Sequence, residues 1–315
     1  MRRFQSTSIP NDARGASVAI GNFDGVHLGH QAVLDVTRSI ANRHSAPLGV
    51  LTFEPHPRSY FSKKSGQDFP PFRLMNADAR ANRLEKLGVD FVFEIPFDDQ
   101  FSRLSDIEFS RDVITQGLGL SHVVVGSDFC FGKGRQGNAS SLTKHGSDFG
   151  FGVTIADLLN HGEKTISSTN IRNALTDGDL QTAAAMLGHW HRIVGPVEHG
   201  EKRGRELGFP TANMSIDGLH LPKFGVYAVT VDVLTGPDAG TYMGAASIGV
   251  RPMFGENHPN CETFLFDFSG DLYGQTLSVG LVEFLRGEEK FDGLDALITQ
   301  MNADCARARQ ILEQI

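Results

Sequence analysis

The stretch from residue 18 to residue 30, VAIGNFDGVHLGH, constrains the fold of this chain more than any other. Its β-branched start predicts a buried strand over Val18–Gly21, its glycines predict a tight turn, and a helix should begin near Gln31. Backbone N–H groups at such a helix start are unpaired and favour phosphate. His27 and His30 add two further donors, although histidines beside a turn also serve as plain helix caps. The stretch therefore predicts a phosphate site where a strand ends.

The first half of the chain alternates strand and helix patterns, which predicts a parallel α/β sheet. In such a sheet ligands bind beyond the carboxyl ends of the strands, where the glycine-rich turn lies. The helix after His30 should place Val33, Val36, Thr37 and Ile40 on one face, and Ser105 with Glu108 has the spacing of a capping box. The expected strands are Val18–Gly21, Leu48–Phe53, Val89–Ile95, His122–Gly126 and Gly152–Ala156.

The pattern changes near Gly188, where a helical stretch over Leu180–Leu187 should end. Short strand patterns separated by Gly, Pro and Asn then predict a small antiparallel sandwich or barrel. One amphipathic helix over Leu294–Leu312 should close the chain. The expected strands of this half are Arg192–Glu198, Gly225–Leu234, Thr241–Ile248, Cys261–Phe268 and Thr276–Leu285.

A length of 315 residues fits two domains, expected at residues 1–187 and 188–315. The net charge of −8 argues against nucleic-acid or anionic-membrane binding, so a phosphate site has to be built locally. Three scattered cysteines fit neither a disulfide framework nor a zinc site, and Cys305 lies on the apolar stripe of the last helix. Because no apolar run approaches the roughly 18 residues of a membrane span and no signal region is present, we expect a cytoplasmic protein.

Two further segments of the first half have features of a nucleotide site. Residues 123–138 read as a strand followed by a glycine-rich basic loop. In residues 166–172, ISSTNIR, Ser168 and Thr169 lead into a helix whose first turn carries Arg172. Hydroxyls, open backbone donors and an arginine in one turn suit phosphates. A Ser/Thr cap beside a solvated arginine is the alternative.

The second half contains the segment GRELGFPTAN at residues 204–213. Its glycines allow the backbone to fold over phosphate, and Thr211 and Asn213 place oxygen ligands on one side of an extended segment. A plain turn over residues 210–213 is the alternative.

Glu262 is the other informative residue of the second half. Alternation along the expected strand Cys261–Phe268 puts Glu262 on one face with Phe264, Phe266 and Phe268. A carboxylate beside an aromatic face is costly unless it is paired or functional, so Glu262 is a candidate general base. An exposed strand end is the alternative.

Together these segments resemble the bacterial bifunctional riboflavin kinase/FAD synthetase family over residues 15–312. Its GxFDGxHxGH signature is matched at residues 21–30, and its GxDFxFGK and ISSTxIR segments at residues 126–133 and 166–172. The riboflavin kinase signature GxxLGxPTAN is matched at residues 204–213. The resemblance implies a Rossmann-like nucleotidyltransferase domain followed by a small antiparallel β-barrel with a terminal helix.

The resemblance implies two reactions: ATP-dependent phosphorylation of riboflavin to FMN, and adenylylation of FMN to FAD, with Mg²⁺ on the nucleotide. Catalytic roles fall on His27, His30 and Glu262, and Asp128 should lie near adenosine or flavin beside Phe129. The implied ATP-binding residues of the first half are Gly21, Phe23, Asp24, Gly25, His27, His30, Asp128, Ser168, Thr169 and Arg172. The implied phosphate-binding residues of the second half are Gly204, Gly208, Pro210, Thr211 and Asn213, with Thr211 and Asn213 as metal ligands.

The chain departs from the family pattern at Met253, where a threonine is usual, and at Gly287, where a proline is common. His56, in a Pro-His-Pro segment after the second strand, serves either as part of a rigid turn or as a ligand contact. Two other functions remain open. One is nucleotidyl transfer to a different phosphate, which leaves the second half without a role. The other is a non-catalytic flavin-binding protein, against which the intact candidate residues argue.

Overall fold

The computed structural model describes residues 1–66, 70–157, 160–161, 164–199, 208–253 and 256–315, with the backbone alone at 160–161, 164–165, 251–253 and 256–257. Packing divides the chain into two compact units, residues 1–69 with 80–166, and residues 70–79 with 167–315. This grouping places the helices over residues 168–187 in the second unit, whereas the sequence predicts a boundary after Leu187. That the segment from residue 188 folds and functions alone stays a prediction.

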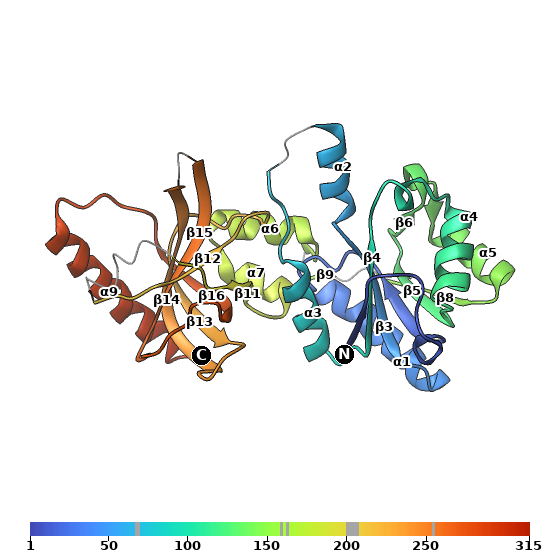
Figure 1. The fold of residues 1–315 in the computed structure, drawn as a ribbon, viewed down its shortest axis with the longest axis horizontal. Helices are drawn as coiled ribbons and strands as arrows, with labels where there is room; N and C mark the ends of the chain where they lie inside the picture. The colour runs from blue at the N-terminus through green and yellow to red at the C-terminus, as the bar shows by residue number, and fades with distance from the viewer. Residues whose placement is uncertain (67–69, 158–159, 162–163, 200–207, 254–255) are drawn as a thin grey trace. The chain divides into compact units, whose positions relative to one another are not determined.

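The first unit is built on a six-stranded parallel sheet, as the alternating sequence predicts (Figure 1). Its spatial order is β1-β4-β3-β2-β5-β8. The five predicted strands are all present. The edge strand β1 is a sixth, which was not predicted because its two arginines give it no apolar pattern. The bounds are β1 (Arg2–Phe4), β2 (Ser17–Ile20), β3 (Leu48–Glu54), β4 (Phe91–Pro96), β5 (His122–Gly126) and β8 (Gly152–Ala156).

Helices cover both faces of this sheet. On one face α1 (Leu28–His44) packs Ile40 against Val124 of β5. On the other face η3 (Phe109–Gly117) and α5 (Ala139–Phe149) contribute to a core that includes Val123 and Val125. The predicted capping box of Ser105 is present at the start of α4. The remaining elements of this part of the chain are η1 (Asn11–Ala13), α2 (Pro57–Ser65), α3 (Ala77–Lys86), η2 (Phe101–Arg103), α4 (Asp106–Glu108), β6 (Cys130–Phe131), η4 (Lys133–Arg135), β7 (Gly137–Asn138), β9 (Asn160–His161) and β10 (Lys164–Thr165).

The strand order creates a switch point beside β2. From β2 the chain moves outward through β3 and β4, and it then returns to place β5 on the other side of β2. Connections that leave in opposite directions open a crevice at the carboxyl ends of such strands. The glycine-rich turn after β2 and the segment after β5 therefore meet at one edge of the sheet.

The second unit contains an antiparallel sheet with the order β11-β16-β13-β14-β15-β12. Glu198 N donates to Asn213 O at 2.8 Å just beyond β11, so the two edge strands approach and the sheet nearly closes into the predicted barrel. The five predicted strands are present, and β12 is an addition to them. The bounds are β11 (His191–Pro196), β12 (Ala212–Ser215), β13 (Gly225–Val233), β14 (Gly240–Met253), β15 (Glu256–Leu265) and β16 (Thr276–Arg286).

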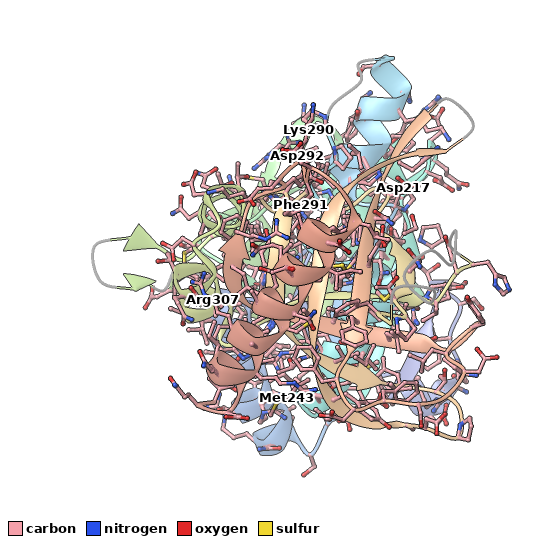
Figure 2. The ribbon with its side chains drawn as sticks, turned by 90° about the vertical axis from the view of Figure 1, so that its left-hand side faces the viewer. Asp217, Met243, Lys290, Phe291, Asp292 and Arg307 are labelled. Atoms are coloured by element: carbon pink, nitrogen blue, oxygen red, sulfur yellow. The ribbon has the colours of Figure 1, made fainter. Side chains whose placement is uncertain are left out.

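The terminal helix α9 (Leu294–Leu312) packs across β13, β14 and β16, as Figures 1 and 2 show. Only its second half is buried, through Ala308 and Leu312, with Cys305 half-buried against the same core. Leu294 is 54% exposed, so the apolar stripe is not covered along its whole length. The helices α6 (Ser168–Asp177) and α7 (Leu180–Leu187) complete this unit, and α7 ends at a left-handed Gly188 as predicted.

His191, on β11, is 4% exposed, and its burial, together with His189 and His220, lowers its pKa to about 3. The folded state therefore keeps His191 neutral between pH 6.5 and about 3, while the unfolded chain binds a proton there. Unfolding takes up that proton, so the free energy of unfolding should fall as the pH drops below 6.5. The expected contribution is about 1.4 kcal/mol for each pH unit.

The measurement is Trp190 fluorescence, because the chain has one tryptophan and it packs against the core of the second unit. In denaturant titrations, the free energy of unfolding should fall less between pH 7 and pH 5 for His191→Leu than for the parent protein. His258→Leu is the control, since that imidazole is 43% exposed and should leave the parent's pH dependence intact. Equal losses in the parent and His191→Leu would contradict the prediction.

Candidate active sites

Both histidines of the glycine-rich stretch lie at the start of α1, which begins at Leu28, earlier than predicted. His27 is the N-cap residue, and its Nδ1 accepts a hydrogen bond from His30 N at 3.3 Å. The interpretation of His27 as a helix cap is therefore confirmed. Since Nδ1 accepts, a neutral His27 carries its proton on Nε2. Capping and phosphate binding use different atoms of one ring and are compatible.

The two imidazole rings stack with their centroids 3.7 Å apart. Burial, and then the nearby His27, hold the pKa of His30 well below its usual value, so His30 is neutral at physiological pH. His30 Nδ1 is buried and has no hydrogen-bond partner in the described part of the chain. Gly29 leaves room for the His27 ring, because a Cβ there would lie 3.1 Å from that ring and would make a tight contact. The pair thus places polar nitrogen atoms at the helix N-terminus without a double charge.

The turn that precedes these histidines is tightly wound. Phe23, Gly25 and Val26 all have positive φ, and Phe23, Asp24 and Val26 are buried. Phe23 packs inside the unit, so it can offer only backbone atoms to a nucleotide. The implied ATP-binding residues Gly21, Phe23, Asp24 and Gly25 share this turn, and their role stays a prediction.

Two further candidates occupy the carboxyl edge of the same sheet. Asp128 is exposed in the turn after β5, next to Phe129, whose ring stacks on Phe131 at 5.4 Å. Phe131 is part of the core, so Phe129 is the more accessible ring of the pair. His56, after β3, is the N-cap of α2 and accepts from Arg58 N at 3.1 Å. His56 thus has a local structural role at the start of α2, and a ligand contact by His56 stays a prediction.

The ISSTNIR segment starts α6 as predicted, with Ser167 as the N-cap and Ser168 and Thr169 in the first turn. Arg172 is half-buried rather than free in solvent: its Nε donates to Phe72 O, and its guanidinium lies 5.3 Å from the Phe72 ring centre. All these residues belong to the second unit. That they act together with His27 and His30 stays a prediction.

In the second unit the structure brings Asn213 and Glu262 together. They are directly paired across the antiparallel strands β12 and β15, so both side chains project from one face. Asn213 is 9% exposed, and its Oδ1 has no hydrogen-bond partner among the residues described. Its Nδ2 donates to Thr211 O at 3.3 Å, which ties the two implied metal ligands to each other.

Glu262 lies inside β15, between β12 and β14, because that strand begins at Glu256 rather than at Cys261. The interpretation of Glu262 as an exposed strand end is therefore wrong. Asn260 Nδ2 donates to Glu262 Oε1 at 3.3 Å. Asn260 was not among the residues predicted from the sequence, although the same alternation that placed Phe264 beside Glu262 also places Asn260 there.

The predicted aromatic face is only partly correct. Phe264 contacts the rings of Phe209 and Phe266 at 5.3 and 5.9 Å. β15 ends at Leu265, however, and the chain turns through Asp267 with φ of 55°. Phe268 therefore leaves this face and contacts Tyr242 instead.

Oxygen atoms near Glu262 suit a magnesium ion. Mg²⁺ prefers oxygen ligands, and the buried Asn213 Oδ1 is an acceptor that lacks a partner. No group of three or more His, Cys, Asp or Glu side chains in the described ranges could hold a metal, so hydroxyl and amide oxygens would have to contribute. Gly208 has φ of +83° and Pro210 is exposed in the turn before β12, whereas Gly204 and the Met253 side chain lie outside the described residues. A Cβ at Gly287 would meet nothing within 4 Å.

None of the helices over the described residues is long and apolar enough to cross a membrane.

A sequence model of the FAD synthetase family matches residues 9–170, and one of the riboflavin kinase family matches residues 187–312. A Pseudomonas fluorescens protein described as a bifunctional riboflavin kinase/FMN adenylyltransferase is 41% identical over 299 residues, 95% of this chain and 93% of that protein. An Escherichia coli K12 protein with the same description is 38% identical over 94% of this chain and 92% of its own length. A solved structure described as a macrolide-efflux protein from Streptococcus pneumoniae superposes with a TM-score of 0.79 at 30% identity, over 96% of each chain. On its two domain matches and these curated relatives, the chain belongs to the bifunctional riboflavin kinase/FMN adenylyltransferase family.

Proposed function

We propose that this chain converts riboflavin to FMN with its second half and FMN to FAD with its first half, using ATP in both steps. The pairing of Glu262 with Asn213 across β12 and β15 carries the proposal, because it puts a carboxylate beside an unsatisfied buried amide oxygen. A flavin-binding protein without chemistry has no need of that arrangement.

In the kinase step Glu262 accepts the proton of the ribityl 5′-hydroxyl while that oxygen bonds to the γ-phosphorus of ATP. The bond from the γ-phosphorus to the β–γ bridging oxygen breaks, and ADP leaves. The Asn260 amide fixes the orientation of the Glu262 carboxylate through its bond to Oε1. Thr211 and Asn213 would hold Mg²⁺, which neutralises charge on the transferred phosphoryl group.

In the adenylyl transfer step an oxygen of the FMN phosphate bonds to the α-phosphorus of ATP, and pyrophosphate leaves. The open N–H groups of α1 and the nitrogen atoms of His27 and His30 stabilise the charge that builds up. Ser168, Thr169 and Arg172 hold the β- and γ-phosphates. Because the incoming phosphate is already an anion, positioning and charge stabilisation suffice.

The substrates are small molecules, and we place the protein in the cytoplasm, free of nucleic acid and membrane. The net charge of −8 supports this, and the three cysteines are free thiols, which suits a reducing compartment.

The test is incubation of the pure protein with riboflavin, ATP and Mg²⁺, followed by chromatographic separation of the flavins. FMN should form first and FAD after it. A nucleotidyltransferase for another substrate would make no FMN, and a flavin-binding protein would leave riboflavin unchanged.

Replacement of His27 should abolish FAD formation while FMN formation persists. We expect His27→Ala to lower adenylyl transfer by at least about 10²-fold, because a transition-state donor is lost. His27→Asn should lose as much, since asparagine restores the helix cap but not the imidazole. The measurement is FAD made from supplied FMN; full activity in His27→Asn would assign His27 to capping alone.

Replacement of Glu262 should affect the kinase alone. Glu262→Gln keeps the shape and removes the base, so riboflavin phosphorylation should fall by roughly 10²–10⁴-fold. FAD formation from supplied FMN should be unchanged. Glu283→Gln, on β16 of the same sheet and separated from β15 by two strands, is the control. If Glu262→Gln phosphorylates riboflavin at a rate near that of the parent, Glu262 is not the general base.

The kinase half should function as a fragment. Residues 189–315 should make FMN and no FAD, but they lack α7, whose Leu180, Met186 and Leu187 are buried. A fragment of residues 167–315 keeps that packing and should unfold at a higher temperature. Thermal melts and FMN assays compare the two. Failure of both fragments to fold or to make FMN would refute the independence of the kinase half.

A further inference from the structure

The turn between β2 and α1 adopts a backbone conformation that its own residues disfavour. Phe23 and Val26 have φ of 51° and 42°, and a β-branched residue such as valine rarely enters that region. Strain of this kind persists only where the surrounding structure over-determines the backbone. The contacts that hold the turn in this conformation are therefore important for its structure.

Side chains bind the turn at both of its ends. At the first end, Thr52 Oγ1 donates to Asn22 O at 3.2 Å, and Arg80 Nη1 donates to the same oxygen at 3.5 Å. At the second end, Gln31 Nε2 donates to Val26 O at 2.9 Å. Phe23, Asp24 and Gly25, three of the proposed ATP-binding residues, lie between these two carbonyls, and His27 follows directly after the second.

Arg80 is a buried anchor. On α3 it is 1% exposed, and its Nη2 donates to Glu54 Oε2 at 3.0 Å and to Glu94 Oε1. Arg3 Nη2 donates to the other oxygen of Glu94 at 2.9 Å. Glu54 ends β3 and Glu94 lies on β4, so the guanidinium is fixed to the carboxyl edge of the sheet.

The planar guanidinium makes this arrangement possible. Nη2 of Arg80 donates to the two carboxylates, and Nη1 donates to Asn22 O. Because the guanidinium is planar and rigid, the carboxylates at the sheet edge also fix the position of the Asn22 carbonyl. A lysine carries the same charge on one flexible point and cannot serve both groups in this way.

We propose that Arg80 is a positioning residue for adenylyl transfer, which acts through the Asn22 carbonyl to hold the turn over residues 21–26 and, with it, His27 in the reactive geometry. The inference rests on the proposed function and adds to it a residue outside the nucleotide site. Its effect should be on the rate of reaction rather than on the binding of FMN.

The principal variant is Arg80→Lys, which keeps a positive charge beside Glu54 and Glu94. We expect kcat for FAD formation from supplied FMN to fall roughly 10–100-fold, as for a small displacement of catalytic groups. KM for FMN should change by less than about threefold, because uniform binding is retained. FMN formation from riboflavin by the same polypeptide should be unchanged, which measures the amount of active protein.

A second variant, Thr52→Val, removes the other bond to Asn22 O without altering any charge. It should lower the same kcat by a smaller factor, and its effect should be non-additive with that of Arg80→Lys, because the two side chains hold one oxygen. Arg14→Lys is the matched control: Arg14 donates to Gly117 O at 2.6 Å and Gln116 O at 3.0 Å, at the end of η3. It should leave FAD formation unchanged.

The outcomes distinguish a failure of the positioning role of Arg80 from a failure of the proposed adenylyl transfer. If the parent makes no FAD, the adenylyl transfer itself is wrong. If the parent makes FAD and both Arg80→Lys and Thr52→Val match its kcat, the positioning role is wrong. It is also wrong if Arg80→Lys loses FAD and FMN formation together, or if Arg14→Lys loses as much kcat as Arg80→Lys.

Discussion

The proposed phosphate site of the first unit depends on a strained turn, and the packing of that turn at the edge of a parallel sheet offsets the strain. Two non-glycine residues with positive φ, Phe23 and Val26, would open in an isolated peptide. Their side chains are buried in the unit, and Asn22 O and Val26 O are both bound by side chains. The burial and these bonds offset the strain. The result is a helix start that arrives at the switch point of the sheet with its histidines already in place.

In the second unit, strand register rather than backbone strain positions the candidate side chains. β12 has only four residues, yet its pairing with β15 sets Asn213 opposite Glu262. A shift of one residue would turn either side chain to the barrel interior, where Cys261 and Thr263 are buried. The closure between Glu198 and Asn213 holds β12 from its other edge. Strand pairing on both sides of β12 thus fixes Asn213 opposite Glu262.

Sequence reasoning succeeded where a pattern is local and failed where packing decides. Alternation and glycine positions predicted ten strands and the helices at residues 180–187 and 294–312. The edge strand β1 was missed because Arg2 and Arg3 give it no apolar pattern, and β12 because Pro210-Thr211 reads as a turn. The register that pairs Asn213 with Glu262 is a long-range property that no local pattern contains. Arg80 was missed for the same reason, since a buried arginine is recognisable only through its partners Glu54 and Glu94.

The chemistry of the two nucleophiles explains why the two sites differ. The ribityl hydroxyl is protonated at neutral pH, so a kinase site needs a base. Glu262, the residue proposed for that role, accepts from the Asn260 amide and is paired with Asn213 across two strands. The FMN phosphate is already ionised, so a base would add only a repulsive negative charge. In its place the first unit presents a helix N-terminus and a buried imidazole, His30, whose pKa is low enough to keep it neutral. A neutral His30 beside His27 avoids charge repulsion within the pair, and a neutral imidazole still carries one N–H that can donate to a phosphate oxygen.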